Sequence, residues 1–200
     1  RALPKAQAGR GDWTRRLHQM WGETWIPSLS LGSRVEQGRE HWLSLDEVQL
    51  SALDLLAEQG RALVQGGAGS GKTLLAVEAA RREAAAGRKV LLLCFTQPLG
   101  KWLRARLAGT GVEVHTVSGL AKAEAEAVDG PSRALDLGDS AAWNRYCERA
   151  ADVCAPRWDA ILVDEAQDLT FEAWWFVGRI AEGCRLWAFH DPGQGFWPDG

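Results

Sequence analysis

The sequence predicts an α/β fold in which a mostly parallel sheet carries helices on both faces. Short apolar runs typical of buried strands occur at residues 62–64, 89–95, 158–163 and 184–189. Between the first two runs, residues 74–86 are rich in Ala, Leu, Glu and Arg, which favours a helix. Strand, helix and strand at this spacing form a βαβ unit, so the strands should be parallel and the sheet covered on both sides.

The chain divides into two segments at about residue 43. Residues 1–43 contain four tryptophans, which we expect to pack on the main domain or on a neighbour rather than to stack nucleic-acid bases. The end of a preceding domain is one interpretation of this segment. Residues 44–200 form the main domain, and a capping box at Ser44 predicts its first helix. The apolar face of that helix is expected to comprise Val48, Ala52, Leu55 and Leu56.

A glycine-rich loop joins the first strand to the helix at residues 74–86. Its sequence matches G-x-x-x-x-G-K-[ST] in the strand–loop–helix setting that this motif requires. Glycines let several backbone amides point at one phosphate, and the helix N-terminus adds a partial positive charge. Lys72 can reach the β- and γ-phosphates, and the Thr73 hydroxyl is a hard oxygen ligand for Mg²⁺. The sequence therefore predicts that a nucleoside triphosphate is bound by Gly66, Gly67, Ala68, Gly69, Ser70, Gly71, Lys72 and Thr73.

The segment after the second strand leads into a helix and then into a loosely patterned region. Residues 96–98 open the helix, because proline suits a first turn. The simplest interpretation of Trp102 in this helix is a core residue, while its basic residues either form a solvated face or contact phosphates. Residues 112–115 read as a short strand, and a small helical insertion is predicted at about 119–157, with a helix at 140–153.

Two adjacent carboxylates, Asp164 and Glu165, follow the strand at residues 158–163. Doubly wound sheets bind ligands at the carboxyl ends of their strands. We expect Asp164 to hold Mg²⁺ and Glu165 to orient or deprotonate an attacking water. The alternative is a solvent-exposed acidic turn, which the nearby phosphate loop disfavours. An apolar helix at 171–182 and a last strand at 184–189 then lead to a polar turn, again at a ligand position.

Composition limits the classes of function. The 200 residues carry a net charge of −3, which argues against a strongly basic nucleic-acid module, so any polynucleotide must meet a local patch or a partner domain. No apolar run approaches the roughly 20 residues of a membrane span. The chain begins with Arg1 and lacks a signal peptide, so we expect a piece of a longer, cytoplasmic protein. The absence of C-x-x-C pairs favours buried free thiols over a zinc site at Cys94, Cys147, Cys154 and Cys184.

With these motifs in order, the chain resembles the first RecA-like domain of superfamily 1 helicases of the UvrD/Rep-like branch. The resemblance spans residues 45–197, and its most specific elements are the loop at 66–73 and the sequence Asp-Glu-Ala-Gln-Asp at 164–168. It implies ATP and Mg²⁺ as cofactors, and single-stranded DNA as the partner, with RNA as the alternative. It also implies that Gln49 reads adenine and that Gln194 senses the γ-phosphate. The nucleic-acid contacts implied by the resemblance are Thr96, Gln97, His115, Thr116 and Trp197.

The chain also departs from the family pattern. His190 stands where a glycine is common, and Asp199 replaces an aromatic residue that usually follows the stacking position. The second RecA-like domain, which in the family supplies arginine fingers and closes the cleft, would lie beyond Gly200. We therefore expect these residues alone to bind nucleotide and to hydrolyse it poorly.

Two functional classes remain open at this stage. The first is the ATP-binding domain of a helicase or translocase, in which Lys72, Glu165 and Gln194 serve catalysis. The second is a nucleotide-dependent switch or signalling ATPase that moves no strand. Gln49 and the Asp-Glu-Ala-Gln-Asp sequence favour the helicase. A binding module that has lost catalysis is disfavoured, because the expected phosphate, metal and water-activating residues are all present.

Overall fold

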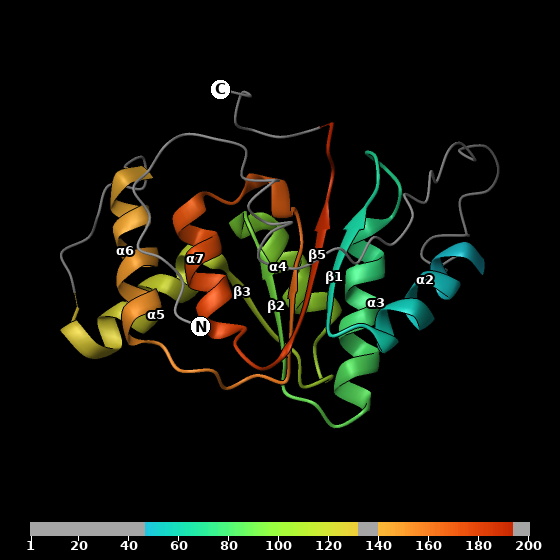
Figure 1. Ribbon diagram of the computed structural model, residues 1–200, viewed down its shortest axis with the longest axis horizontal. Helices are drawn as coiled ribbons and strands as arrows, with labels where there is room; N and C mark the ends of the chain where they lie inside the picture. Colours follow the sequence, from blue (N-terminus) through green and yellow to red (C-terminus); the bar gives the residue numbers. More distant parts are fainter. Residues whose placement is uncertain (1–46, 132–139, 194–200) are drawn as a thin grey trace.

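The computed structural model describes residues 47–131 and 140–193 (Figure 1). Within these residues, five strands form one sheet in the order β1-β5-β4-β2-β3, with every neighbouring pair parallel. The predicted α/β fold with a parallel sheet is confirmed. The strands are β1 (Arg61–Gln65), β2 (Val90–Cys94), β3 (Glu113–Thr116), β4 (Ala160–Val163) and β5 (Arg185–His190).

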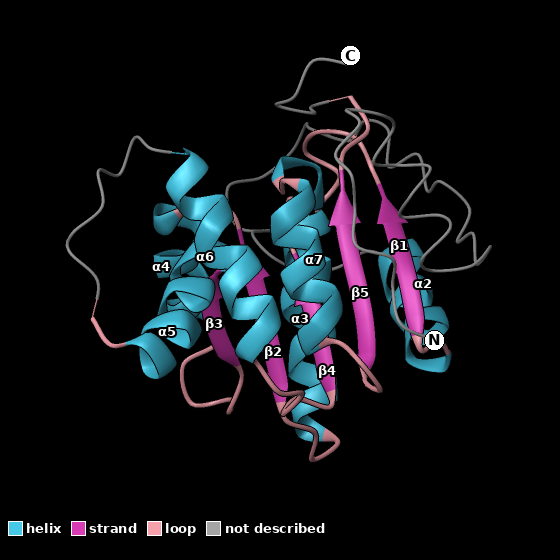
Figure 2. Ribbon diagram, turned by 60° about the vertical axis from the view of Figure 1, so that its left-hand side comes forward, coloured by secondary structure: helices cyan, strands magenta, loops and turns pink. Residues whose placement is uncertain are grey.

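Helices cover both faces of the sheet, and Figure 2 shows α6 and α7 in front of the strands. One layer comprises α2 (Glu47–Glu58), α3 (Lys72–Ala85) and α4 (Gln97–Arg106). The other comprises α5 (Val117–Asp129), α6 (Ser140–Val153) and α7 (Phe171–Ile180).

Each strand supplies side chains to both layers, because successive residues of a strand point to opposite faces. In β2, Leu92 packs in the core beneath α3, whereas Leu91 and Leu93 pack in the core beneath α7. In β4, Leu162 packs in the core beneath α3, and Ile161 packs in the core beneath α7. Strands buried on both sides must be apolar throughout, which is why they appear in the sequence as unbroken apolar runs.

The strand order decides which loops meet. All five strands are parallel, so their carboxyl ends lie at one edge of the sheet, and β5 runs between β1 and β4. In the register of β1 and β5, Gln65 lies opposite His190. The glycine-rich loop that follows Gln65 is therefore adjacent to Asp191, and the acidic pair after β4 approaches Asp191 from the other side.

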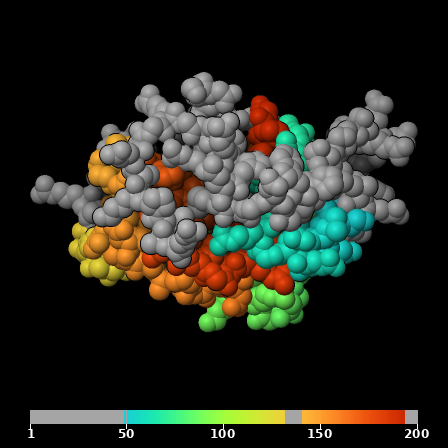
Figure 3. Space-filling model, viewed as in Figure 1, coloured from blue at the N-terminus to red at the C-terminus, as the bar shows by residue number. Residues whose placement is uncertain are grey.

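The described residues of the predicted helical insertion form α5 and α6, which belong to the main core. Tyr146, Cys147 and Ala150 of α6 pack in the same apolar cluster as Phe176 and Val177 of α7. In the space-filling view, the described residues of α5 and α6, in yellow and orange, lie at the opposite end from the cyan atoms of α2 (Figure 3). No helix in the part of the chain that the structure describes has the length and apolar character to cross a membrane.

Two predictions about buried faces are wrong. Leu55 is 50% exposed, because α2 buries Ala52, Leu53 and Leu56, a stripe centred beside Leu55 rather than on it. Trp102 is 42% exposed, with the Arg106 guanidinium 5.9 Å from its ring centroid, and is not a core residue. On the face of α4 that meets the core, Leu103 and the C-cap residue Leu107 are buried and Leu99 is partly buried. The capping box at Ser44 and the segment 1–43 lie outside the described residues.

Candidate nucleotide-binding site

The glycine-rich loop is anchored to the sheet at its first residue. The Gly66 amide donates to the His190 carbonyl at 3.1 Å, and the Ser70 amide donates to the Gly67 carbonyl at 3.2 Å. Gly66 has no room for a side chain, since a Cβ there would lie 2.5 Å from the Ser70 hydroxyl oxygen. Gly71 favours glycine because its φ is +83°, and a Cβ there would lie 2.5 Å from Gln49 Nε2, so the Gln49 side chain would have to move. These constraints explain the glycines of the motif in this chain.

The N-terminus of α3 opens directly onto this loop. The Leu75 amide is the first to find a helical partner, the Gly71 carbonyl at 2.9 Å. For residues 72–74 the carbonyl four positions earlier lies in the loop, so their amides have no partner within the helix. The N-cap residue Gly71 has no side chain to cap them. Free amides and the helix dipole together suit an anion such as a phosphate.

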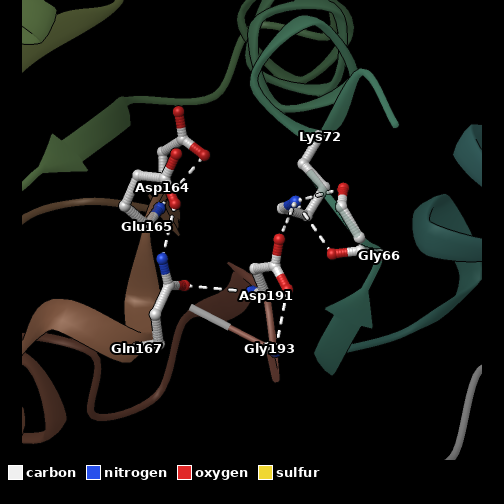
Figure 4. Close-up of polar contacts among 8 residues, drawn as sticks. Gly66, Lys72, Asp164, Glu165, Gln167, Asp191 and Gly193 are labelled. Carbon is white, nitrogen blue, oxygen red and sulfur yellow. Dashed lines mark hydrogen bonds and ion pairs between the residues drawn. The ribbon is translucent and has the colours of Figure 1, made fainter. Parts of the chain in front are cut away.

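Lys72 lies at the centre of the site and points back across the loop (Figure 4). Its Nζ donates to the carbonyls of Gly66 at 2.8 Å and Gly67 at 2.9 Å. It also forms an ion pair with Asp191 Oδ2 at 3.6 Å, and the Lys72 side chain is only 10% exposed. A nearly buried ammonium beside free amides concentrates positive charge where phosphates are predicted to bind.

Asp164 suits a metal ligand. Its side chain is fully buried, and Oδ1 accepts the Glu165 amide at 3.1 Å. The other oxygen, Oδ2, is buried without a hydrogen-bond partner, an arrangement that a cation would satisfy. Burial raises the pKa of this carboxyl from its ordinary 3.8 to about 6, an effect that a hydrogen bond from the Thr73 hydroxyl partly offsets. Two oxygen ligands on adjacent elements, Thr73 and Asp164, therefore fit the predicted Mg²⁺, which itself stays a prediction.

Glu165 and Gln167 form the second half of the acidic motif. Glu165 has φ +53°, the only positive φ outside glycine among the described residues, so its backbone is held in an uncommon conformation. The short 3₁₀ helix η1 (Ala166–Asp168) then turns Gln167 back toward it. Gln167 Nε2 donates to Glu165 Oε2 at 2.6 Å, and Gln167 Oε1 accepts the Asp191 amide at 3.0 Å. A buried glutamine thus connects the end of β4 to the end of β5.

Sequence reasoning assigned no role to Gln167, which lies in the Asp-Glu-Ala-Gln-Asp sequence, or to Asp191, which lies in the polar turn after the last strand. The available signal was their position, because each follows a buried strand at its carboxyl end. What brings them together is the pairing of β4 with β5, which no local pattern specifies.

Gln49 lies beside the loop, as an adenine-reading residue requires. Its Nε2 donates to the Ser70 carbonyl at 3.0 Å, and the side chain is half-buried. Gln49 lies some 20 residues before Ser70 in the chain, and α2 places its side-chain amide against the phosphate loop.

The residues predicted to contact nucleic acid lie at the ends of β2 and β3. Thr96 and Gln97 are exposed at the start of α4, where the Thr96 hydroxyl accepts the Leu99 amide at 3.4 Å. His115 is half-buried, and burial lowers the pKa of its imidazole. Thr116 is only 3% exposed, and its hydroxyl accepts from Gln97 Nε2 at 3.2 Å.

The contact of Thr116 with nucleic acid stays a prediction, and in the structure the Thr116 hydroxyl caps α5. The Gly119 amide donates to it at 3.1 Å. The Gln97–Thr116 bond holds the N-termini of α4 and α5 side by side at one end of the sheet. Gln194 and Trp197 lie outside the described residues.

Comparison with protein families decides the broad class of the chain. A family model described as an AAA domain matches residues 35–196. The chain belongs to this family. It is therefore a P-loop domain that binds ATP, a nucleotide hydrolase of the kind found in UvrD/Rep-type helicases. A search of curated proteins finds none that matches the sequence.

Proposed function

We propose that this chain is the ATP-binding RecA-like domain of a superfamily 1 motor that moves on single-stranded DNA. The observation that carries the proposal is the polar chain that runs from the phosphate loop to the acidic pair. Lys72 faces Asp191, the Asp191 amide donates to Gln167, and Gln167 donates to Glu165 (Figure 4). A motor needs such a connection, since the state of the nucleotide must reach residues beyond the phosphate site.

In this proposal, each group at the site has a separate task. Gln49 selects adenine by hydrogen bonds from its amide, and the phosphate loop binds the phosphates with the free amides of residues 72–74 at the start of α3. Thr73 and Asp164 hold Mg²⁺, which would neutralise charge on the phosphates when bound. Glu165 orients the attacking water and accepts its proton, and Gln167 fixes the Glu165 carboxylate through one short hydrogen bond.

The proposed nucleic-acid site lies farther along the same edge of the sheet. The exposed residues Thr96 and Gln97, together with His115, surround the adjacent N-termini of α4 and α5, which suit backbone phosphates. Trp197 is proposed to stack a base, and Gln194 to sense the γ-phosphate. A second RecA-like domain of the same protein is the proposed partner that closes on ATP and supplies the arginine fingers.

The test is ATP hydrolysis by the natural protein that contains these residues, with and without single-stranded DNA. We expect the DNA to stimulate hydrolysis severalfold and Lys72→Ala to abolish both hydrolysis and nucleotide binding. Lys122→Ala is the matched control, since that lysine lies on α5 far from the loop in sequence and only pairs with Glu126 at 3.8 Å.

Each outcome of this test has a clear meaning. Hydrolysis that is stimulated by RNA and not by DNA would identify RNA as the partner. Hydrolysis that neither polynucleotide affects would favour a nucleotide-dependent switch. Unchanged nucleotide affinity in Lys72→Ala would refute the assignment of the loop.

A further inference from the structure

Lys72 has one hydrogen-bond donor that the phosphate loop does not use. A lysine ammonium carries three donors. Two of them go to the carbonyls of Gly66 and Gly67, at 2.8 and 2.9 Å. The ammonium also faces the Asp191 carboxylate at 3.6 Å. A phosphate that binds to Lys72 must therefore compete with Asp191 for the same ammonium.

The Asp191 carboxylate depends on that ammonium for compensation of its charge. Its side chain is only 4% exposed, and Oδ2 is buried without a hydrogen-bond partner. A buried carboxylate costs free energy unless a positive charge lies close to it. If a phosphate pairs with Lys72, the Asp191 carboxylate stays buried beside a negative charge and loses its positive partner. The carboxylate then has to turn or move away.

Movement of Asp191 cannot stay local, because both of its neighbours depend on its position. Oδ1 accepts the Gly193 amide at 2.9 Å, which shapes the turn at residues 191–193. The Asp191 amide donates to Gln167 Oε1 at 3.0 Å, and Gln167 in turn holds Glu165. The turn itself is free to respond, since Pro192 and Gly193 are exposed.

We propose that Asp191 is the resident counter-ion of Lys72, that nucleotide phosphate displaces it, and that the displacement reshapes the turn at residues 191–193. The proposal rests on the proposed role of residues 66–73 as the phosphate loop. It assigns Asp191 a positioning role through Lys72 and the turn, rather than a contact with nucleotide. It also implies that Asp191 weakens nucleotide binding, because the same carboxylate must leave Lys72 for the turn to change.

The first experiment measures the affinity of this 200-residue chain for ADP by calorimetry. Asp191→Asn removes the competing charge but keeps an oxygen that can accept the Gly193 amide. We expect the variant to bind ADP about tenfold more tightly, both with Mg²⁺ and with EDTA, an effect near the lower limit of those measured for close charge pairs. Asp54→Asn is the matched control, since Asp54 forms a 2.9 Å ion pair with Arg82 on the exposed surface of α2 and α3. The control should leave the affinity unchanged.

The outcomes separate this proposal from the function on which it rests. Equal or weaker binding by Asp191→Asn, with normal binding by the wild type, overturns the proposal and leaves the phosphate loop intact. Weaker binding only in the presence of Mg²⁺ also overturns it, because Asp191 would then serve the metal. Failure of the wild type to bind ADP at all would instead count against the phosphate loop.

A second measurement needs no substitution. The Gly193 amide resonance reports the position of the Asp191 carboxylate, because that carboxylate is its acceptor. We expect saturating ADP to shift this resonance in the ¹⁵N-labelled wild type, and the Gly183 amide, in the turn before β5, to stay in place. A Gly193 resonance that does not move when ADP is bound would refute the displacement.

Discussion

Replacement of Asp164 by asparagine should stabilise the chain in the absence of nucleotide and abolish its response to Mg²⁺. Asp164 is fully buried and directly follows β4, with its amide bonded to the Leu93 carbonyl at 2.8 Å. Asparagine has nearly the same shape and can still accept the Glu165 amide through its carbonyl oxygen. The substitution therefore removes the charge and leaves the packing in place.

The size of the effect follows from the pKa of the carboxyl group. Burial raises this pKa from 3.8 to about 6, so the folded chain binds the proton more tightly than the unfolded chain. At low pH both states are protonated and the carboxyl costs nothing. As the pH rises from about 4 to 6, the unfolded chain loses this proton while the folded chain keeps it, so the cost accumulates and reaches about 3 kcal/mol above pH 6. Asp164→Asn should recover about 1–3 kcal/mol of that cost.

The assay is urea unfolding of the wild type and the variant at pH 8 and at pH 4 without nucleotide. The stabilisation should be large at pH 8 and should fall toward zero as the pH approaches 4. Asp152→Asn, an exposed position on α6, should change the free energy of unfolding little at either pH. A destabilised Asp164→Asn at pH 8, or a gain that does not depend on pH, would refute this account of the buried carboxyl.

Three further substitutions test other parts of the site. Gln49→Ala should weaken ATP binding about tenfold through loss of two hydrogen bonds and leave GTP binding unchanged, as measured by competition titration; equal losses would contradict adenine reading. Gln167→Met should lower kcat about 10- to 100-fold with KM nearly constant, because Glu165 loses its 2.6 Å partner; steady-state kinetics check this, and a change confined to KM would count against a positioning role. Gly71→Ala should destabilise the chain by about 1–2 kcal/mol and weaken nucleotide binding, because φ is +83° and the new methyl group meets Gln49; a neutral effect in thermal unfolding would show that the loop relaxes.

The parts of the site that sequence could predict are those encoded by neighbouring residues. The phosphate loop and the acidic pair each lie within eight consecutive residues, so the residue types reveal the chemistry directly. The contacts of Lys72 with Asp191 and of Gln167 with Asp191 join segments that are far apart in the chain, and they exist because β5 lies between β1 and β4. Strand order is a property of the whole core, and local patterns do not determine it.

The errors at Leu55 and Trp102 have a related cause. Helical periodicity identifies an apolar stripe, but its centre depends on where the helix contacts its neighbours. In α2 the stripe at positions 52, 53 and 56 faces α3 and β1, which leaves Leu55 outside it. Leu55 in α2 and Trp102 in α4 each lie beside the buried stripe of their helix, so including them made the predicted apolar face too wide.

The construction of the sheet restricts how a nucleotide signal can travel through this domain. β4 and β2 are buried strands that are hydrogen-bonded to each other, so we expect them to move together as one rigid unit. In the turn at residues 191–193, Pro192 and Gly193 are exposed, and Asp191 is held by the Gln167 bond and by the charge of Lys72. Under the displacement of Asp191 that we propose, a change at the phosphates is therefore absorbed first by this turn.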